Sequence, residues 1–241
     1  MKPRNLLTLL FSSILVLGFV FTGCEKEKRE CSGTIEKEFA LTGFSRITAG
    51  ETFSINIEKG SNYSIKATGC ANEIADLDLS VGNGQVLNIQ YKKQIYDRNK
   101  VSFTITLPVL VATNISSAAK VNITGFSGQS SVIRNVLSGS AECTLNGTGI
   151  VTQIDLSGAA KLTVTGDTEN LYGNLSGSAR LDAYGLLSNE VDISTSGTAK
   201  AYVSPQQKLF VSASGASYVY YKGNPSTKNF ETTGTSKVIQ E

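Results

Sequence analysis

The sequence predicts an all-β protein whose main part is a β-solenoid, a parallel β-helix-like stack of coils of about 19 residues. A β-rich N-terminal section precedes this stack. Two observations lead to the prediction: a Ser-Gly corner recurs at a regular short interval, and apolar residues alternate with polar ones on both sides of each corner. No stretch shows the long 3.6-residue period of an amphipathic helix.

The N-terminus has the layout of a bacterial signal peptide. Lys2 and Arg4 precede an apolar stretch, which ends at Gly23-Cys24 before an abruptly charged segment. Residues 1–23 are therefore expected to be removed. A small residue followed by cysteine resembles a lipobox, which predicts that Cys24 is lipidated and becomes the new N-terminus. The alternative is an ordinary cleavage site with Cys24 nearby by chance.

These features predict the cellular location of the protein and the order of its domains. Acyl chains on Cys24 would anchor the protein to a membrane of the cell envelope, and we expect the outer membrane, on its periplasmic or surface face. Residues 24–31 would then be a charged tether, residues 32–110 the β-rich N-terminal section, and residues 111–241 the repetitive solenoid. Ligand, leaflet, oligomeric state and handedness are left open.

Composition excludes several functions. The chain has no histidine, which removes Ser/His/Asp and Cys/His catalysis and histidine-ligated zinc. Cleavage before Cys24 would remove two basic residues and no acidic one, so the formal charge of +2 falls to zero and gives no reason to expect nucleic acid as a partner. Cys31 and Cys70 could form a disulfide in an oxidising envelope, or both could be isolated buried thiols.

The repeat is plainest in the second half of the chain. The corner glycines are Gly139, Gly158, Gly177, Gly197, Gly215 and Gly234. Glycine suits a corner where the backbone needs positive φ. A unit this short cannot bury its own apolar face, so units are expected to stack in register about 4.8 Å apart. Stacking predicts two inner columns, one formed by Val121, Cys143, Leu162, Leu181, Ala201, Val219 and Val238, the other by Ile123, Leu145, Val164, Ala183, Val203 and Tyr221.

Several segments resemble a known family. They are Phe44-Ser45-Arg46-Ile47, Phe53-Ser54-Ile55-Asn56-Ile57-Glu58, Ile105-Thr106-Leu107-Pro108 and the Ser-Gly repeats. Together they resemble the "putative autotransporter adhesin, head GIN domain" family, whose members are often lipoproteins of Gram-negative bacteria. The resemblance runs from about Phe39 to the end of the chain and implies a β-solenoid and an adhesive function. It implies no catalytic residues.

One outward column is the candidate ligand-binding site. Stacking would make Lys161, Arg180 and Lys200 neighbours, with Tyr202, Tyr218 and Tyr220 beside them. Aromatic faces next to cations and hydroxyls suit a sugar or an anionic surface polymer. The alternative is that the long basic side chains splay apart and the tyrosines are ordinary residues of exposed strands.

Two further functions were weighed against adhesion. Some carbohydrate-active enzymes use carboxylates on a β-solenoid, but Asp155, Asp182 and Asp192 fall at different offsets in their units and are not expected to converge. The last strand, ending at Glu241, has no obvious polar cap and could pair with a second copy or an envelope protein. The prediction is a non-enzymatic adhesion or surface-binding module without cofactor or metal, the alternative being a glycan-binding module or carbohydrate-active enzyme.

Overall fold

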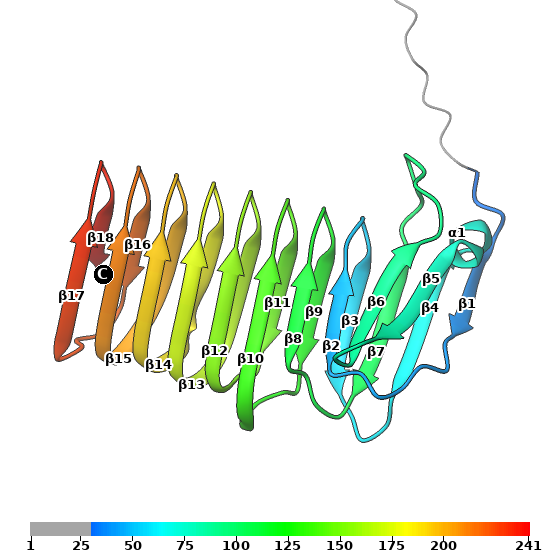
Figure 1. Cartoon of the computed structure of the whole chain (residues 1–241), viewed down its shortest axis with the longest axis horizontal. Coiled ribbons are helices and arrows are strands. Elements are labelled where there is room, and N and C mark those ends of the chain that lie inside the picture. The colour runs from blue at the N-terminus through cyan, green and yellow to red at the C-terminus, as the bar shows by residue number, and fades with distance from the viewer. Residues whose placement is uncertain (1–29) are drawn as a thin grey trace, which may run out of the picture.

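The computed structural model describes residues 30–241, which form a two-sheet β-solenoid of about seven turns. Each coil consists of a strand of sheet one, a tight corner and a strand of sheet two. Figure 1 shows the coils side by side with all their corners on the same edge. The predicted fold class is therefore confirmed.

The regular coils are built from eleven strands. The bounds are β8 Ala112–Ile115, β9 Lys120–Thr124, β10 Gln129–Leu137, β11 Glu142–Asn146, β12 Gly149–Leu156, β13 Lys161–Leu175, β14 Arg180–Thr195, β15 Lys200–Ala213, β16 Tyr218–Tyr221, β17 Thr227–Thr232 and β18 Lys237–Gln240. Three of these strands, β13, β14 and β15, are long because each leaves one corner on sheet two and reaches the next corner on sheet one.

The N-terminal strands supply two more coils and a cap. Here lie β1 Thr34–Glu38, β2 Arg46–Ala49, β3 Ser54–Lys59, β4 Ser64–Cys70, β5 Leu77–Gly82, β6 Val86–Tyr91, β7 Ser102–Leu107 and the short helix α1 Ala71–Ala75. β2 lies between β6 and β8, and β3 between β7 and β9, all parallel. The coil β2–β3 is thus inserted between two coils that follow it in the chain.

Antiparallel strands close this end of the stack. β4 pairs with β7 and β1 pairs with β4, while β5 pairs with β6 on the other sheet. The disulfide Cys31–Cys70 joins the start of the described chain to the end of β4. Of the two alternatives for these cysteines, the structure has the bridge.

The corners explain the repeated glycine. Gly177 has φ +71°, and a Cβ atom built there would lie 2.8 Å from the carbonyl oxygen of Gly158 in the preceding coil. That oxygen accepts a hydrogen bond of 2.7 Å from the Ser178 amide. Both the positive φ and the close approach require glycine, as predicted.

The two predicted inner columns form the core. Cys143 is in register with Val121 and Leu162, and the series continues through Leu181 to Val238. Most side chains of both columns are fully buried, and Val238 in the last coil is half-buried. The alternation in the sequence therefore identifies the inside of the solenoid.

Candidate functional site

The outer face of sheet two carries two columns of polar side chains. The first, which we call the charged column, follows the corner and contains Ser54, Lys120, Glu142, Lys161, Arg180, Lys200, Tyr218 and Lys237. The second lies two residues further along each strand and contains Asn56, Asn122, Thr144, Thr163, Asp182, Tyr202, Tyr220 and Ile239. Parallel in-register stacking thus brings the six predicted ligand-binding residues to one face.

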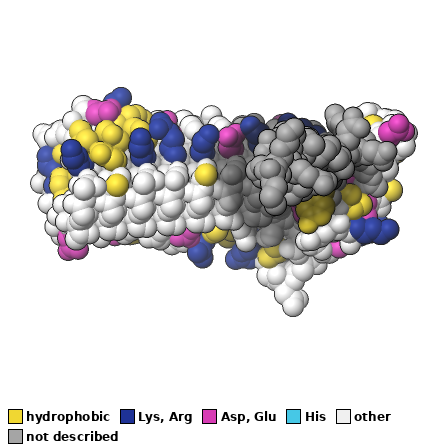
Figure 2. All heavy atoms as spheres, turned by 90° about the horizontal axis from the view of Figure 1, so that it is seen from above, with side chains coloured by type: hydrophobic (Ala, Val, Ile, Leu, Met, Phe, Trp, Pro, Cys, Tyr) yellow, Lys and Arg dark blue, Asp and Glu magenta, His cyan; other side chains and the backbone are white. Residues whose placement is uncertain are grey.

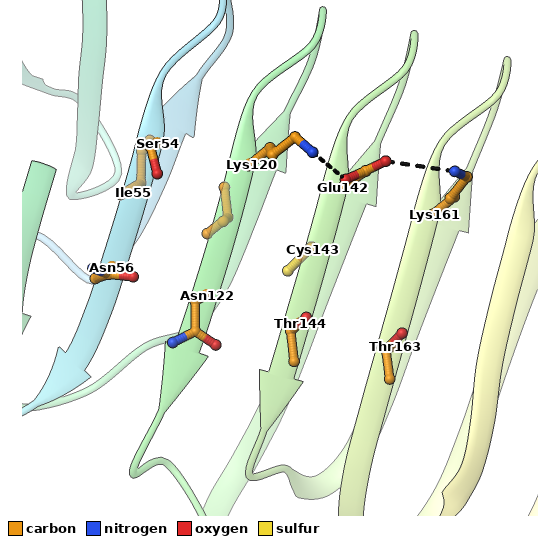
Figure 3. Close-up of a pocket in the computed structure, with 11 residues that line it drawn as sticks. Ser54, Ile55, Asn56, Lys120, Asn122, Glu142, Cys143, Thr144, Lys161 and Thr163 are labelled. Atoms are coloured by element: carbon orange, nitrogen blue, oxygen red, sulfur yellow. Dashed lines mark hydrogen bonds and ion pairs between the residues drawn. The ribbon is translucent and has the colours of Figure 1, made fainter. Parts of the chain in front are cut away.

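In the N-terminal half of the charged column one carboxylate bridges two lysines. Glu142 lies between Lys120 and Lys161, with Oε2 2.8 Å from one Nζ and Oε1 3.5 Å from the other (Figure 3). Hydrogen bonding and charge attraction to Lys120, and then to Lys161, hold the pKa of Glu142 below its usual value. Lys161 is therefore an ion-pair partner, which weakens its role as a free cation.

A shallow depression lies beside this part of the column. Its volume is about 370 Å³, and short side chains, Asn56, Asn122, Thr144 and Thr163, follow one another across it (Figure 3). In the C-terminal half of the stack, the column that contains these Asn and Thr residues continues with Tyr202 and Tyr220. The face changes along the stack from a hollowed polar surface to an aromatic one.

The aromatic part is a cluster of four residues, Tyr184, Tyr202, Tyr218 and Tyr220, which we call the tyrosine cluster. The Tyr202 and Tyr220 rings are stacked, with centroids 4.9 Å apart and planes 8° from parallel. Tyr218 stacks on Tyr220 at 6.0 Å, and Tyr184 meets Tyr202 edge to face at 5.3 Å. Such pairs each add about 0.5–1.5 kcal/mol beyond burial, so the cluster is a firm platform.

Cations border this platform. The Arg180 guanidinium lies 4.1 Å from the centroid of the Tyr202 ring and donates a hydrogen bond of 2.9 Å to the Tyr202 hydroxyl. Lys222 Nζ lies 4.3 Å from the Tyr184 ring. Figure 2 shows a row of basic side chains leading to a group in the hydrophobic colour, which includes tyrosine, near one end of the stack. The face thus offers planar rings next to positive charge.

Three members of this surface were missed by the sequence analysis: Tyr184, Lys222 and Glu241. The Tyr184 hydroxyl donates a hydrogen bond of 2.7 Å to Glu241 Oε2. Burial, and then this hydrogen bond and the charge of Glu241, raise the pKa of Tyr184 above its ordinary value. The sequence does indicate that Tyr184 faces outward, because it continues the alternation in which Arg180 and Asp182 are the outward residues.

The three acidic residues weighed for catalysis do not converge. Asp182 lies on sheet two, where its Oδ2 is 3.7 Å from Arg180 Nη2. Asp155 and Asp192 lie on sheet one, and Asp155 Oδ2 is 2.8 Å from Arg134 Nη2. Burial opposes ionisation of Asp155, but hydrogen bonds from Asn174 and Arg134 hold its pKa below the usual value. No pair of these carboxylates flanks a common bond.

The predicted lipidation site Cys24 and the signal peptide lie outside the described residues, and no helix within residues 30–241 is long and apolar enough to span a bilayer. In the same range no group of three Cys, Asp or Glu side chains is placed to hold a metal ion.

Residues 43–225 match a family model described as "Putative auto-transporter adhesin, head GIN domain". No curated protein matches the chain.

Solved structures share the fold at low sequence identity. A "putative adhesin" from Bacteroides fragilis is 19% identical, with a TM-score of 0.76 over 87% of this chain and 98% of that one. A "putative adhesin" from Parabacteroides merdae is 16% identical, with a TM-score of 0.68 over 87% and 97% of the two chains. A "putative lipid binding protein" from Parabacteroides distasonis is 15% identical, with a TM-score of 0.64 over the same shares.

Proposed function

Because the chain belongs to the family described as "Putative auto-transporter adhesin, head GIN domain", we propose that it is a non-enzymatic adhesion module of the cell envelope that binds a surface glycan. The tyrosine cluster, with Arg180 and Lys200 beside it, is the binding surface. The observation that carries this proposal is the stacked pair Tyr202 and Tyr220 next to the Arg180 guanidinium.

The chemistry of this surface suits a sugar. The apolar C–H face of a pyranose ring lies well against an aromatic ring, while its hydroxyls need donors and acceptors at the edge. Here Tyr218 stacks on Tyr220 through one face and would offer its other face to the sugar, while the hydroxyls of the stacked pair, Arg180 and Lys200 would supply the hydrogen bonds. The two cations favour glycans that carry carboxylate or sulfate groups, since a guanidinium binds such groups through paired hydrogen bonds.

The test is an array of bacterial and host glycans probed with the soluble fragment from Cys31 to Glu241. A variant carrying Arg180→Ala, Tyr202→Ala and Tyr220→Ala is run beside it. The matched control is Tyr172→Ala, which removes a tyrosine that is 38% exposed and lies on sheet one. Binding that is lost in the triple variant and kept in the control supports the proposal, and no binding by the unaltered fragment refutes it.

Anchoring is the second part of the proposal. Acylation of Cys24 would hold the module on the outer membrane. Mass spectrometry of the protein purified from cell membranes should find the acyl chains on Cys24, and Cys24→Ser should move the protein from the membrane to the soluble fraction. An unacylated Cys24 in the mature protein would contradict this part without bearing on glycan binding.

A second candidate contact is self-association through β17 and β18. Within the described residues β17 pairs only with β15, and β18 only with β16. Every residue of β17 is exposed, including Phe230 at 38%. An open strand edge can add the strand of a second copy. Sedimentation velocity should then show a dimer that Phe230→Lys returns to monomer; a monomer at high concentration refutes this contact.

A further inference from the structure

The segment between β6 and β7, residues 92–100, is an exposed loop that the rest of the molecule holds rigidly. Arg98 is buried against α1. Its Nη1 lies 2.7 Å from Oε2 of Glu73 in the helix, and its Nη2 pairs with Asp76, the residue that follows the helix. The same Nη2 donates to the carbonyl of Lys93, and the guanidinium stacks 3.6 Å from the Tyr91 ring. The Arg98 side chain is only 5% exposed. Breaking such a buried ion pair costs several kcal/mol, so the loop is fixed.

The tip of this rigid loop exposes apolar side chains that the fold does not use. Tyr96 is 90% exposed and its neighbour Ile95 is 37% exposed. Lys93 and Lys100, on either side of this pair, are also exposed. An aromatic and an aliphatic residue side by side between lysines, held on a fixed backbone, suit the interface of a membrane. Tyrosine is enriched at the headgroup level, and lysine attracts anionic lipids.

The position of the loop near the start of the described chain is a second reason to expect that it contacts a membrane. The helix α1 that holds Arg98 also holds the start of the described chain, because Asn72 Nδ2 donates a hydrogen bond of 3.0 Å to the Glu30 carbonyl. Figure 1 shows the loop rising from the end of the solenoid where the described chain begins. Cys24 precedes Glu30 by six residues, which span at most about 20 Å when fully extended. A lipid on Cys24 would keep this loop within reach of the bilayer surface.

We infer that the loop tip, Ile95 and Tyr96, inserts into the lipid headgroup region and fixes the solenoid on the membrane. This inference rests on the proposed lipid anchor, and not on glycan binding. One short loop has little affinity by itself, but the tether makes its contact intramolecular and so raises its effective concentration. The loop rises on the same edge of the stack as the corners (Figure 1). The tyrosine cluster lies roughly 35 Å from the cap, about seven coil spacings along the axis.

The absence of tryptophan from the sequence allows a direct experiment. Tyr96→Trp places a single fluorophore at the loop tip, and Phe230→Trp places one in the last coil. Each full-length lipidated protein is reconstituted into vesicles that contain brominated phosphatidylcholine and anionic phosphatidylglycerol. We expect the tryptophan of Tyr96→Trp to be quenched at least twofold, while that of Phe230→Trp keeps its intensity. Equal quenching of both, or quenching of neither, overturns the inference.

A second arm separates the loop from the anchor. The chain from Glu25 onward, with an N-terminal hexahistidine tag, is held on vesicles containing a nickel-chelating lipid, so that it is tethered without Cys24. Tyr96→Trp should again be quenched, and Ile95→Ser in the same chain should reduce the quenching. Lys93→Gln with Lys100→Gln should reduce it on anionic vesicles and leave it unchanged on neutral ones. A tethered loop that stays unquenched overturns the inference even if the anchor is real.

Discussion

Tyr202 and Tyr220 occupy the same position of successive coils, and their rings are stacked with centroids 4.9 Å apart. The stack arises because the register of a parallel solenoid repeats each outward position one strand spacing away. Two tyrosines that are 18 residues apart in the chain thereby become one stacked pair.

Removal of either ring should weaken glycan binding without unfolding the protein. A contact between a sugar and the cluster that is worth as much as one aromatic pair, about 0.5–1.5 kcal/mol, means that Tyr202→Ala or Tyr220→Ala should raise the Kd roughly 2- to 12-fold. Titration calorimetry with the best glycan of the array measures this, with Tyr172→Ala as the control. Unchanged affinity in both cluster variants would move the binding site elsewhere.

The corners of the later coils, from Gly139 onward, should tolerate glycine and little else. Gly177→Ala places a Cβ atom 2.8 Å from the Gly158 carbonyl oxygen at φ +71°, so we expect it to lower the free energy of unfolding by about 1–3 kcal/mol. The matched substitution is Ser117→Gly, because Ser117 has φ 60° at the corner of an earlier coil. It should leave the stability unchanged or raise it. Urea unfolding compares the two, and equal effects would contradict the account of the corners.

The disulfide should stabilise the cap. Cys31 and Cys70 are separated by 39 residues, and closing a loop of this size contributes about 2–4 kcal/mol. Cys31→Ser should lower the melting temperature, and dithiothreitol should lower that of the unaltered protein but not that of the variant. A melting temperature that is insensitive to reductant would show that the cap is held by its strand pairing alone.

Cys143 should be unreactive in the folded protein. Burial raises the pKa of its thiol to about 12 from an ordinary value of 9.0, and the thiolate is the reactive form. Iodoacetamide at pH 8.5 should modify Cys143 in guanidinium and leave it unmodified in buffer, as read by mass spectrometry. Because the folded state binds this proton more tightly than the unfolded state, the free energy of unfolding keeps its full value below about pH 9 and falls as the pH rises from about 9 to 12. Rapid labelling of the native protein would mean that the coil opens at β11.

Local patterns were enough for the regular part of the fold. The alternation along Leu162 and Val164 marks the inside of a coil, and the corner glycines mark its length, because both follow from the geometry of one strand and one turn. Residues 46–59 were harder to interpret. Their corner has Glu51 at φ 58° where the later coils have glycine, so the repeat that identifies a coil is hidden.

By itself, the sequence determined the β-solenoid, its inner columns and the row that joins Lys161, Arg180 and Lys200, since a fixed repeat length dictates which residues stack. Only the tertiary structure decided that the coil β2–β3 lies between two later coils, that Cys31 meets Cys70, and that Tyr184 joins Tyr202. Each of these depends on contacts between segments distant in the chain, or on an irregular register such as that between Ala183 and Leu187. Such contacts are selected by packing and pairing across the whole stack: the local alternation indicates that Tyr184 faces outward, but not which ring it meets.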